Sequence, residues 1–107
     1  GTKLGEFQAV PHKFADMRML METARLVTYR TAAMLDAGED AVTETAIAKV
    51  VATENNFKAA DLGMQVMGAA GYVQGDMQRL FREGRMGMIG GGTSEILRNV
   101  IAKRMGI

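Results

Sequence analysis

The residues best suited to chemistry lie in one stretch near the carboxyl end, IGGGTSEILR at residues 89–98. Three consecutive glycines free the backbone from ordinary steric limits, so it can approach a ligand or another chain closely. Thr93 is a predicted N-cap, because its hydroxyl can accept a hydrogen bond from an N–H group one turn on. Glu95 follows in the first predicted turn, where its charge complements the helix dipole. Such a loop can bind a polar or anionic group, although a plain loop-to-helix cap explains the pattern about as well.

Other reactive groups are scarce. His12 is the only histidine and cysteine is absent, so the sequence predicts no metal site, no disulfide and no thiol chemistry. No Ser-His-Asp set has usable spacing. The glycine run also lacks the lysine of a phosphate-binding P-loop, which argues against nucleotide hydrolysis.

Apolar residues at helical spacing predict the elements that position this stretch. A long helix is expected from Pro11 to Ala37, with Gly38 as its stop, and a second from near Thr43 to the GAAG run at residues 68–71. A turn at residues 72–75, a short helix around residues 77–85 and a last helix over residues 94–105 follow. Short connections favour antiparallel neighbours, so residues 1–107 are predicted to form one all-α domain, an up-and-down helical bundle.

Composition excludes several classes of partner. The net charge of +1 produces no strong field for nucleic acid, and no run of eighteen apolar residues could span a membrane. No signal peptide is visible, and with the lack of cysteine this leads us to expect an intracellular protein. Three arginines around the short helix are interpreted as solvated or ion-paired rather than phosphate-binding. A chain of this length should bury roughly two-thirds of its unfolded surface.

Several short motifs follow one another along the chain. They are GEFQ at residues 5–8, KFADM at 13–17, MQVMGAAGY at 64–72, RLFR at 79–82, GTSEI at 92–96 and IAKR at 101–104, with Arg98 between the last two. Together they closely resemble the C-terminal helical domain of acyl-CoA dehydrogenases. The resemblance covers essentially the whole sequence, and the order of several motifs makes it more specific than any one glycine run.

The resemblance implies a segment of a larger FAD enzyme, of which residues 1–107 form the last domain. Members of this family remove the α-proton of an acyl-CoA with a glutamate while a hydride passes from the β-carbon to the flavin. Electrons then usually leave through an electron-transfer flavoprotein. The C-terminal domain packs at subunit contacts of a homo-oligomer, here expected to be a dimer or tetramer, and helps to hold FAD.

The resemblance also assigns residues to FAD in three groups. Phe7 and Gln8 are similar to a pair that meets the FAD of a neighbouring subunit. A segment near the adenine end of that cofactor is matched by Gln65, Val66, Met67, Gly68 and Ala69. Thr93, Ser94 and Glu95 are similar to the stretch that contacts the cofactor at the glycine loop. Gly91 and Gly92 are then expected close to the substrate.

One departure from the family pattern concerns the catalytic base. Many members carry Tyr-Glu-Gly-Thr at residues 90–93, and that glutamate is the base, whereas this chain has Gly91 there, which cannot accept a proton. No catalytic residue is therefore predicted within the chain. The isovaleryl and long-chain branches also have glycine at this position and place the base on a preceding helix. That helix would lie before Gly1, so the predicted bundle lacks it. GAAG at residues 68–71 also replaces the more common Gly-Gly-x-Gly.

Three functional hypotheses stay open. The favoured one is a working acyl-CoA dehydrogenase whose base lies upstream, in which the isolated chain is inactive. The second is a catalytically inactive homologue that serves binding or assembly, and the third is a stand-alone helical interaction module. The resemblance implies the cytoplasm of a bacterium or the mitochondrial matrix of a eukaryote. Without the upstream helix, the isolated chain is expected to associate with itself.

Overall fold

All regular secondary structure in the chain is helical. The computed structural model describes all residues, Gly1–Ile107, and contains no strand. A 3₁₀ helix, η1 (Leu4–Glu6), precedes five α-helices, which are α1 (Ala9–Asp36), α2 (Val42–Met67), α3 (Ala69–Tyr72), α4 (Asp76–Gly87) and α5 (Ser94–Met105). The all-α prediction is confirmed, and α5 has the predicted bounds. The short helix α3 lies where we expected only the end of the second helix and the start of a turn.

Glycines end the two long helices where the sequence predicts. Gly38 follows α1 with φ +74°, and Gly68 follows α2 with φ +57°. Residues with a side chain rarely adopt such φ values, so glycine is the natural stop at both places. Helix α1 begins two residues earlier than predicted. Pro11 still lies in its first turn, where a backbone N–H has no partner within the helix.

The sequence predicts that the second helix opens near Thr43, with Thr43 as a candidate cap, and the structure differs in the cap. Thr43 is the second residue of the helix, and Ala41 holds the cap position without a side-chain hydrogen bond. Instead the Asp40 carboxylate accepts a hydrogen bond from the Val42 N–H at 3.3 Å. A residue before the helix can reach a free N–H of the first turn, whereas a residue already in helical conformation cannot.

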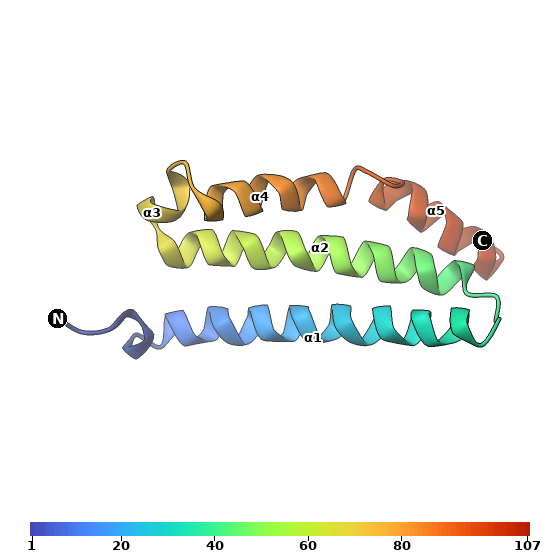
Figure 1. The fold of residues 1–107 in the computed structure, drawn as a ribbon, viewed down its shortest axis with the longest axis horizontal. Coiled ribbons are helices and arrows are strands. Elements are labelled where there is room, and N and C mark those ends of the chain that lie inside the picture. Colours follow the sequence, from blue (N-terminus) through green and yellow to red (C-terminus); the bar gives the residue numbers. More distant parts are fainter.

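Helix α2 is the centre of the molecule (Figure 1). Helix α1 lies antiparallel along one side of it, and α4 and α5 follow one another along the other side. Helix α1 makes no contact with α4 or α5, so the helices form one open layer around α2. The up-and-down order of the prediction is confirmed.

Small side chains allow the helices to pack closely. The buried apolar residues are Ala41, Ala46, Ala48 and Val50, all at or near the start of α2. Across the first interface, the Thr31 hydroxyl donates to the Glu44 carbonyl at 3.2 Å. Across the second, a Cβ added to Gly87 would lie 3.2 Å from the Thr53 side chain. The absence of a side chain at Gly87 therefore sets how closely α4 approaches α2.

The open layer leaves much apolar surface exposed. The accessible surface is 7469 Å², against about 5,800 Å² for a compact monomer of this mass. Only about 56% of the unfolded surface is buried, so the expected two-thirds was too high, because a single layer of helices cannot enclose a core. Helix α1 exposes Phe14 and Met21 on one flank and Met19 and Leu26 on another. A helix that is apolar on several sides is built to be covered on several sides.

Candidate functional site

The loop between α4 and α5 contains the left-handed backbone conformations that its glycines suggest, but only at two of the three glycines. Gly91 and Gly92 have φ values of +66° and +92°, whereas Gly90 has no positive φ. The Ser94 N–H donates to the Met88 carbonyl at 3.1 Å and closes the loop. A Cβ on Gly91 would meet no atom of the chain within 4 Å. The backbone at Gly91 is therefore open to close approach from outside.

Helix α5 begins as predicted. Thr93 is the N-cap, and its hydroxyl accepts a hydrogen bond from the Ile96 N–H at 3.2 Å. Glu95 is exposed in the first turn. Ser94 is only 5% exposed, and its hydroxyl oxygen has no hydrogen-bond partner of ordinary geometry. A buried hydroxyl without a partner is uncommon, because leaving it unsatisfied costs about 1–3 kcal/mol.

Four backbone donors at this loop are free. The N–H groups of Gly91, Gly92, Thr93 and Glu95 donate no hydrogen bond within the chain. They lie at the positive end of the α5 dipole, which favours negative charge. This combination of free donors, dipole and open glycines can bind a polar or anionic group at the start of α5.

Side chains of α2 brace this loop and helix. The Lys49 ammonium donates to the Gly92 carbonyl at 2.6 Å. Farther along α2, the Glu54 carboxylate pairs with the Arg98 guanidinium at 2.7 Å. The hydrogen bond from Arg98 holds the pKa of Glu54 below its usual value of 4.5, with a smaller contribution from Ser94, and the pair raises the pKa of Arg98. No sequence pattern predicts these contacts, apart from the charge of Lys49 within an apolar run.

A further ion pair holds the other end of α5. Arg104 pairs with Asp40, which lies in the connection between α1 and α2. This hydrogen bond, followed by that from the Val42 N–H, lowers the pKa of the Asp40 carboxyl. Side chains of α2 thus hold the start of α5 and the loop before it, and the connection between α1 and α2 holds the end of α5.

The second group of predicted cofactor residues lies where α2 meets α3. Gln65, Met67, Gly68 and Ala69 are exposed and Val66 is half-buried. Gly68 has φ +57° and ψ −138°, whereas Ala69 begins α3 without a positive φ. Alanine in place of a second glycine therefore introduces no backbone strain here.

Phe7 and Gln8 are exposed just before α1, at the same end of the molecule as α3 (Figure 1). The glycine loop is not at this end. Lys49, which bonds the loop, precedes Gln65 by sixteen residues of α2, or about 24 Å at the helical rise. The structure brings the first two groups to one end of the layer and keeps the third group apart from them.

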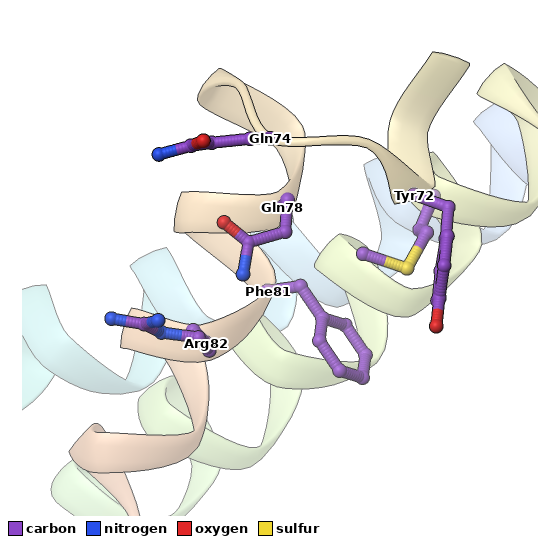
Figure 2. Close-up of a pocket in the computed structure, with 6 residues that line it drawn as sticks. Tyr72, Gln74, Gln78, Phe81 and Arg82 are labelled. Carbon is purple, nitrogen blue, oxygen red and sulfur yellow. The ribbon is translucent and has the colours of Figure 1, made fainter. Parts of the chain in front are cut away.

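A pocket of about 520 Å³ opens near that same end, between α3 and α4 (Figure 2). Its lining consists of Met64, Tyr72, Gln74, Gln78, Phe81 and Arg82. The three arginines of α4 differ in their contacts. Arg79 pairs with Asp76 and Glu83, Arg85 lies 5.6 Å from the ring centre of Phe57, and Arg82 has no carboxylate partner. All three arginines are exposed, so the solvated or ion-paired interpretation describes them, and Arg85 has the ring of Phe57 as an additional contact.

Other sites are not indicated. His12 is exposed, and no group of three or more His, Asp or Glu side chains is arranged to hold a metal ion. No helix combines the length and the apolar character that crossing a membrane requires.

The family described as "Acyl-CoA dehydrogenase, C-terminal domain" matches residues 1–106. The mitochondrial short-chain specific acyl-CoA dehydrogenase of Bos taurus is 39% identical over 103 residues, which are 95% of this chain and 25% of that protein. The benzylmalonyl-CoA dehydrogenase of Aromatoleum aromaticum is also 39% identical, over 98% of this chain and 28% of its own length. The chain thus spans about a quarter of the length of these relatives.

Solved structures agree with the sequence matches. A protein from Mycobacterium smegmatis described as an acyl-CoA dehydrogenase superposes with a TM-score of 0.95 at 34% identity, over 99% of this chain and 28% of that one. The FAD complex of PigA superposes with a TM-score of 0.93 at 29% identity over the same shares. The chain belongs to the acyl-CoA dehydrogenase family, whose C-terminal helical domain it matches along essentially its whole length.

Proposed function

We propose that residues 1–107 are the C-terminal domain of an FAD-dependent acyl-CoA dehydrogenase, which introduces a double bond between the α and β carbons of an acyl-CoA thioester. The observation that carries the proposal is the glycine loop before α5. Four free N–H donors there meet the positive end of a helix dipole, in a chain that belongs to this family.

The residues of this loop fit a flavin cofactor. Gly91 leaves the backbone open, and the free Thr93 and Glu95 N–H groups can orient polar atoms of FAD, while the buried Ser94 lies directly beneath them at the first position of α5. FAD, when bound, accepts the hydride that leaves the β-carbon. The remaining cofactor residues are Phe7, Gln8, Gln65, Val66, Met67, Gly68 and Ala69. Because they lie at the other end of the layer, we assign them to the FAD of a neighbouring subunit.

The chain does not supply the base that removes the α-proton. By the resemblance to the family, Gly91 stands where many members carry a glutamate, and no side chain lies within 4 Å of the space that a Cβ would fill there. Gly91 and Gly92 would instead allow the thioester to approach the backbone. A glutamate elsewhere in the full-length protein would act as the base, so the isolated chain should have no turnover.

Assembly and electron transfer complete the proposal. The open apolar flanks of α1 suit a homo-oligomer, a dimer or tetramer, in which neighbouring subunits cover them. An electron-transfer flavoprotein would accept the electrons. Relatives from mitochondria and from bacteria support action in the mitochondrial matrix or the bacterial cytoplasm.

The test is reduction of the bound flavin in the full-length protein by a series of acyl-CoA esters without oxygen. We expect at least one ester to bleach the oxidised flavin absorption, and no reaction from residues 1–107 mixed with free FAD. Bound flavin that no ester reduces would favour the catalytically inactive homologue. Failure of the full-length protein to bind FAD at all would favour a helical interaction module.

A further inference from the structure

Lys49 is the one side chain outside the loop and α5 that hydrogen-bonds the glycine loop. It lies on α2, is half-buried, and donates from its ammonium group to the Gly92 carbonyl at 2.6 Å across 43 positions of sequence. No carboxylate lies within 4.0 Å of it, since none of the five ion pairs of the chain includes it. Its charge is therefore directed to a single carbonyl, and a charge-assisted hydrogen bond is roughly twice as strong as a neutral one.

This bond determines where a free donor points. The Gly92 carbonyl and the Thr93 N–H belong to one planar trans peptide unit, in which they face opposite directions. Drawing the carbonyl toward α2 therefore turns the Thr93 N–H away from α2. The Thr93 N–H is one of the four donors without a partner in the chain. Gly91 and Gly92 have little intrinsic preference for one φ sign, so a contact with α2 adds to the hydrogen bond between Ser94 and Met88 in keeping this orientation.

We propose that Lys49 is a positioning residue, which holds the Gly92–Thr93 peptide so that the free donors of the loop face an incoming ligand group. Naming FAD as that ligand rests on the proposed function. The orientation of the peptide does not depend on it, because it follows from the contact between Lys49 and Gly92 alone.

The first experiment measures loop order in the cofactor-free full-length protein by hydrogen exchange and mass spectrometry. The amides of Ser94 and Ile96 report on it, because they bond to the Met88 carbonyl and the Thr93 hydroxyl. Lys49→Met should speed their exchange about tenfold, as expected for loss of a charge-assisted bond. Lys49→Arg should restore slow exchange, and Lys58→Met, an exposed lysine of the same helix, should leave it unchanged. Unchanged exchange in Lys49→Met would overturn the proposal.

The second experiment measures the dissociation constant for FAD by flavin fluorescence. Lys49→Met should weaken binding about tenfold, with Lys49→Arg within about threefold of the parent protein. Lys49→Gln replaces Lys49→Met if the latter does not fold, as judged by its thermal unfolding midpoint. Equal affinity in the parent, Met and Gln proteins would refute the positioning role. Absence of FAD binding in the parent protein would refute the proposed function instead, and the exchange experiment would still decide the role of Lys49.

Discussion

At the scale of residues, the three consecutive glycines are not equivalent. Gly91 has φ +66° and Gly92 has φ +92°, while Gly90 adopts an ordinary φ and has room for a Cβ, 3.6 Å from the nearest atom. A residue with a side chain pays roughly 1–2 kcal/mol for the left-handed conformation. The loop therefore requires glycine at positions 91 and 92 but not at position 90. The sequence alone could not show this difference, because it contains three identical residues in a row.

Alanine substitutions at Gly91 and Gly90 distinguish the effect of backbone strain on stability from the effect of a side chain on FAD binding. Gly91→Ala should destabilise the full-length protein by roughly 1–2 kcal/mol through its φ alone, since its Cβ meets no atom of the chain. If FAD or the thioester lies against this loop, FAD affinity should fall by more than about tenfold. Gly90→Ala is the matched control and should change stability by less than about 0.5 kcal/mol. Thermal unfolding and flavin titration give the two values, and equal losses in both would indicate a purely structural loop.

The ion pair between Glu54 and Arg98 should make stability depend on pH. Arg98 lowers the pKa of Glu54 below 4.5 in the folded state, so the folded protein binds this proton less readily than the unfolded chain. The stabilisation is therefore fully present above about pH 4.5 and is lost as pH falls through the lowered pKa.

Glu54→Gln should flatten that dependence, so that the unfolding free energy falls less steeply below pH 4.5 than in the parent protein. Glu39→Gln is the control, because Glu39 is exposed and forms no ion pair. Urea unfolding at a series of pH values measures the effect. An identical slope in the parent and Glu54→Gln proteins would show that the pair does not contribute.

At the scale of elements, the features that the sequence predicts are those with local causes. Thr93 caps α5 and Gly38 ends α1, because the relevant hydrogen bonds and φ values involve residues within one turn. Helix α3 was missed because it depends on how Gly71 packs against the end of α2. Likewise, the contact between Lys49 and Gly92 joins residues 43 positions apart. The periodicity of a helix predicts neighbours only within the same helix, so it could not predict this contact.

Gly71 should be the least replaceable glycine of the turn between α2 and α4. A Cβ there would lie 2.9 Å from the Met67 Cβ and 3.1 Å from the Met64 carbonyl oxygen, and neither atom can move freely. Gly71→Ala should therefore destabilise the protein by about 1–3 kcal/mol. Gly75→Ala is the control, since its Cβ would meet only the Val73 carbonyl, at 3.9 Å. Chemical denaturation compares the two, and equal stability would mean that α3 shifts to make room.

At the scale of the whole molecule, the open layer explains both the exposed surface and the elongated shape. The radius of gyration is 16.7 Å, against about 13 Å for a compact domain of this length. The excess accessible surface is about 1,600 Å², which is enough for each copy to form an interface of standard size. The exposed apolar surface is therefore of the kind that further helices or other subunits cover when a larger core forms.

The isolated chain should therefore associate with itself. Sedimentation equilibrium at micromolar concentration is expected to show a dimer or a larger species, because burial of the α1 flanks outweighs the cost of association. Replacing Phe14 and Met21 by lysine should shift the equilibrium toward monomer, since both side chains are exposed on one flank. A compact monomer of the parent chain would show instead that the helices rearrange and close their own core.

If this domain helps to hold FAD in a larger enzyme, as we propose, the purified full-length protein should contain flavin. The absorption spectrum and the protein concentration together give the ratio of FAD to polypeptide. We predict a yellow protein with FAD in a one-to-one ratio to the polypeptide, and loss of that flavin when Lys49 and Gly91 are replaced together. A colourless protein that takes up no FAD from excess free cofactor would contradict the claim.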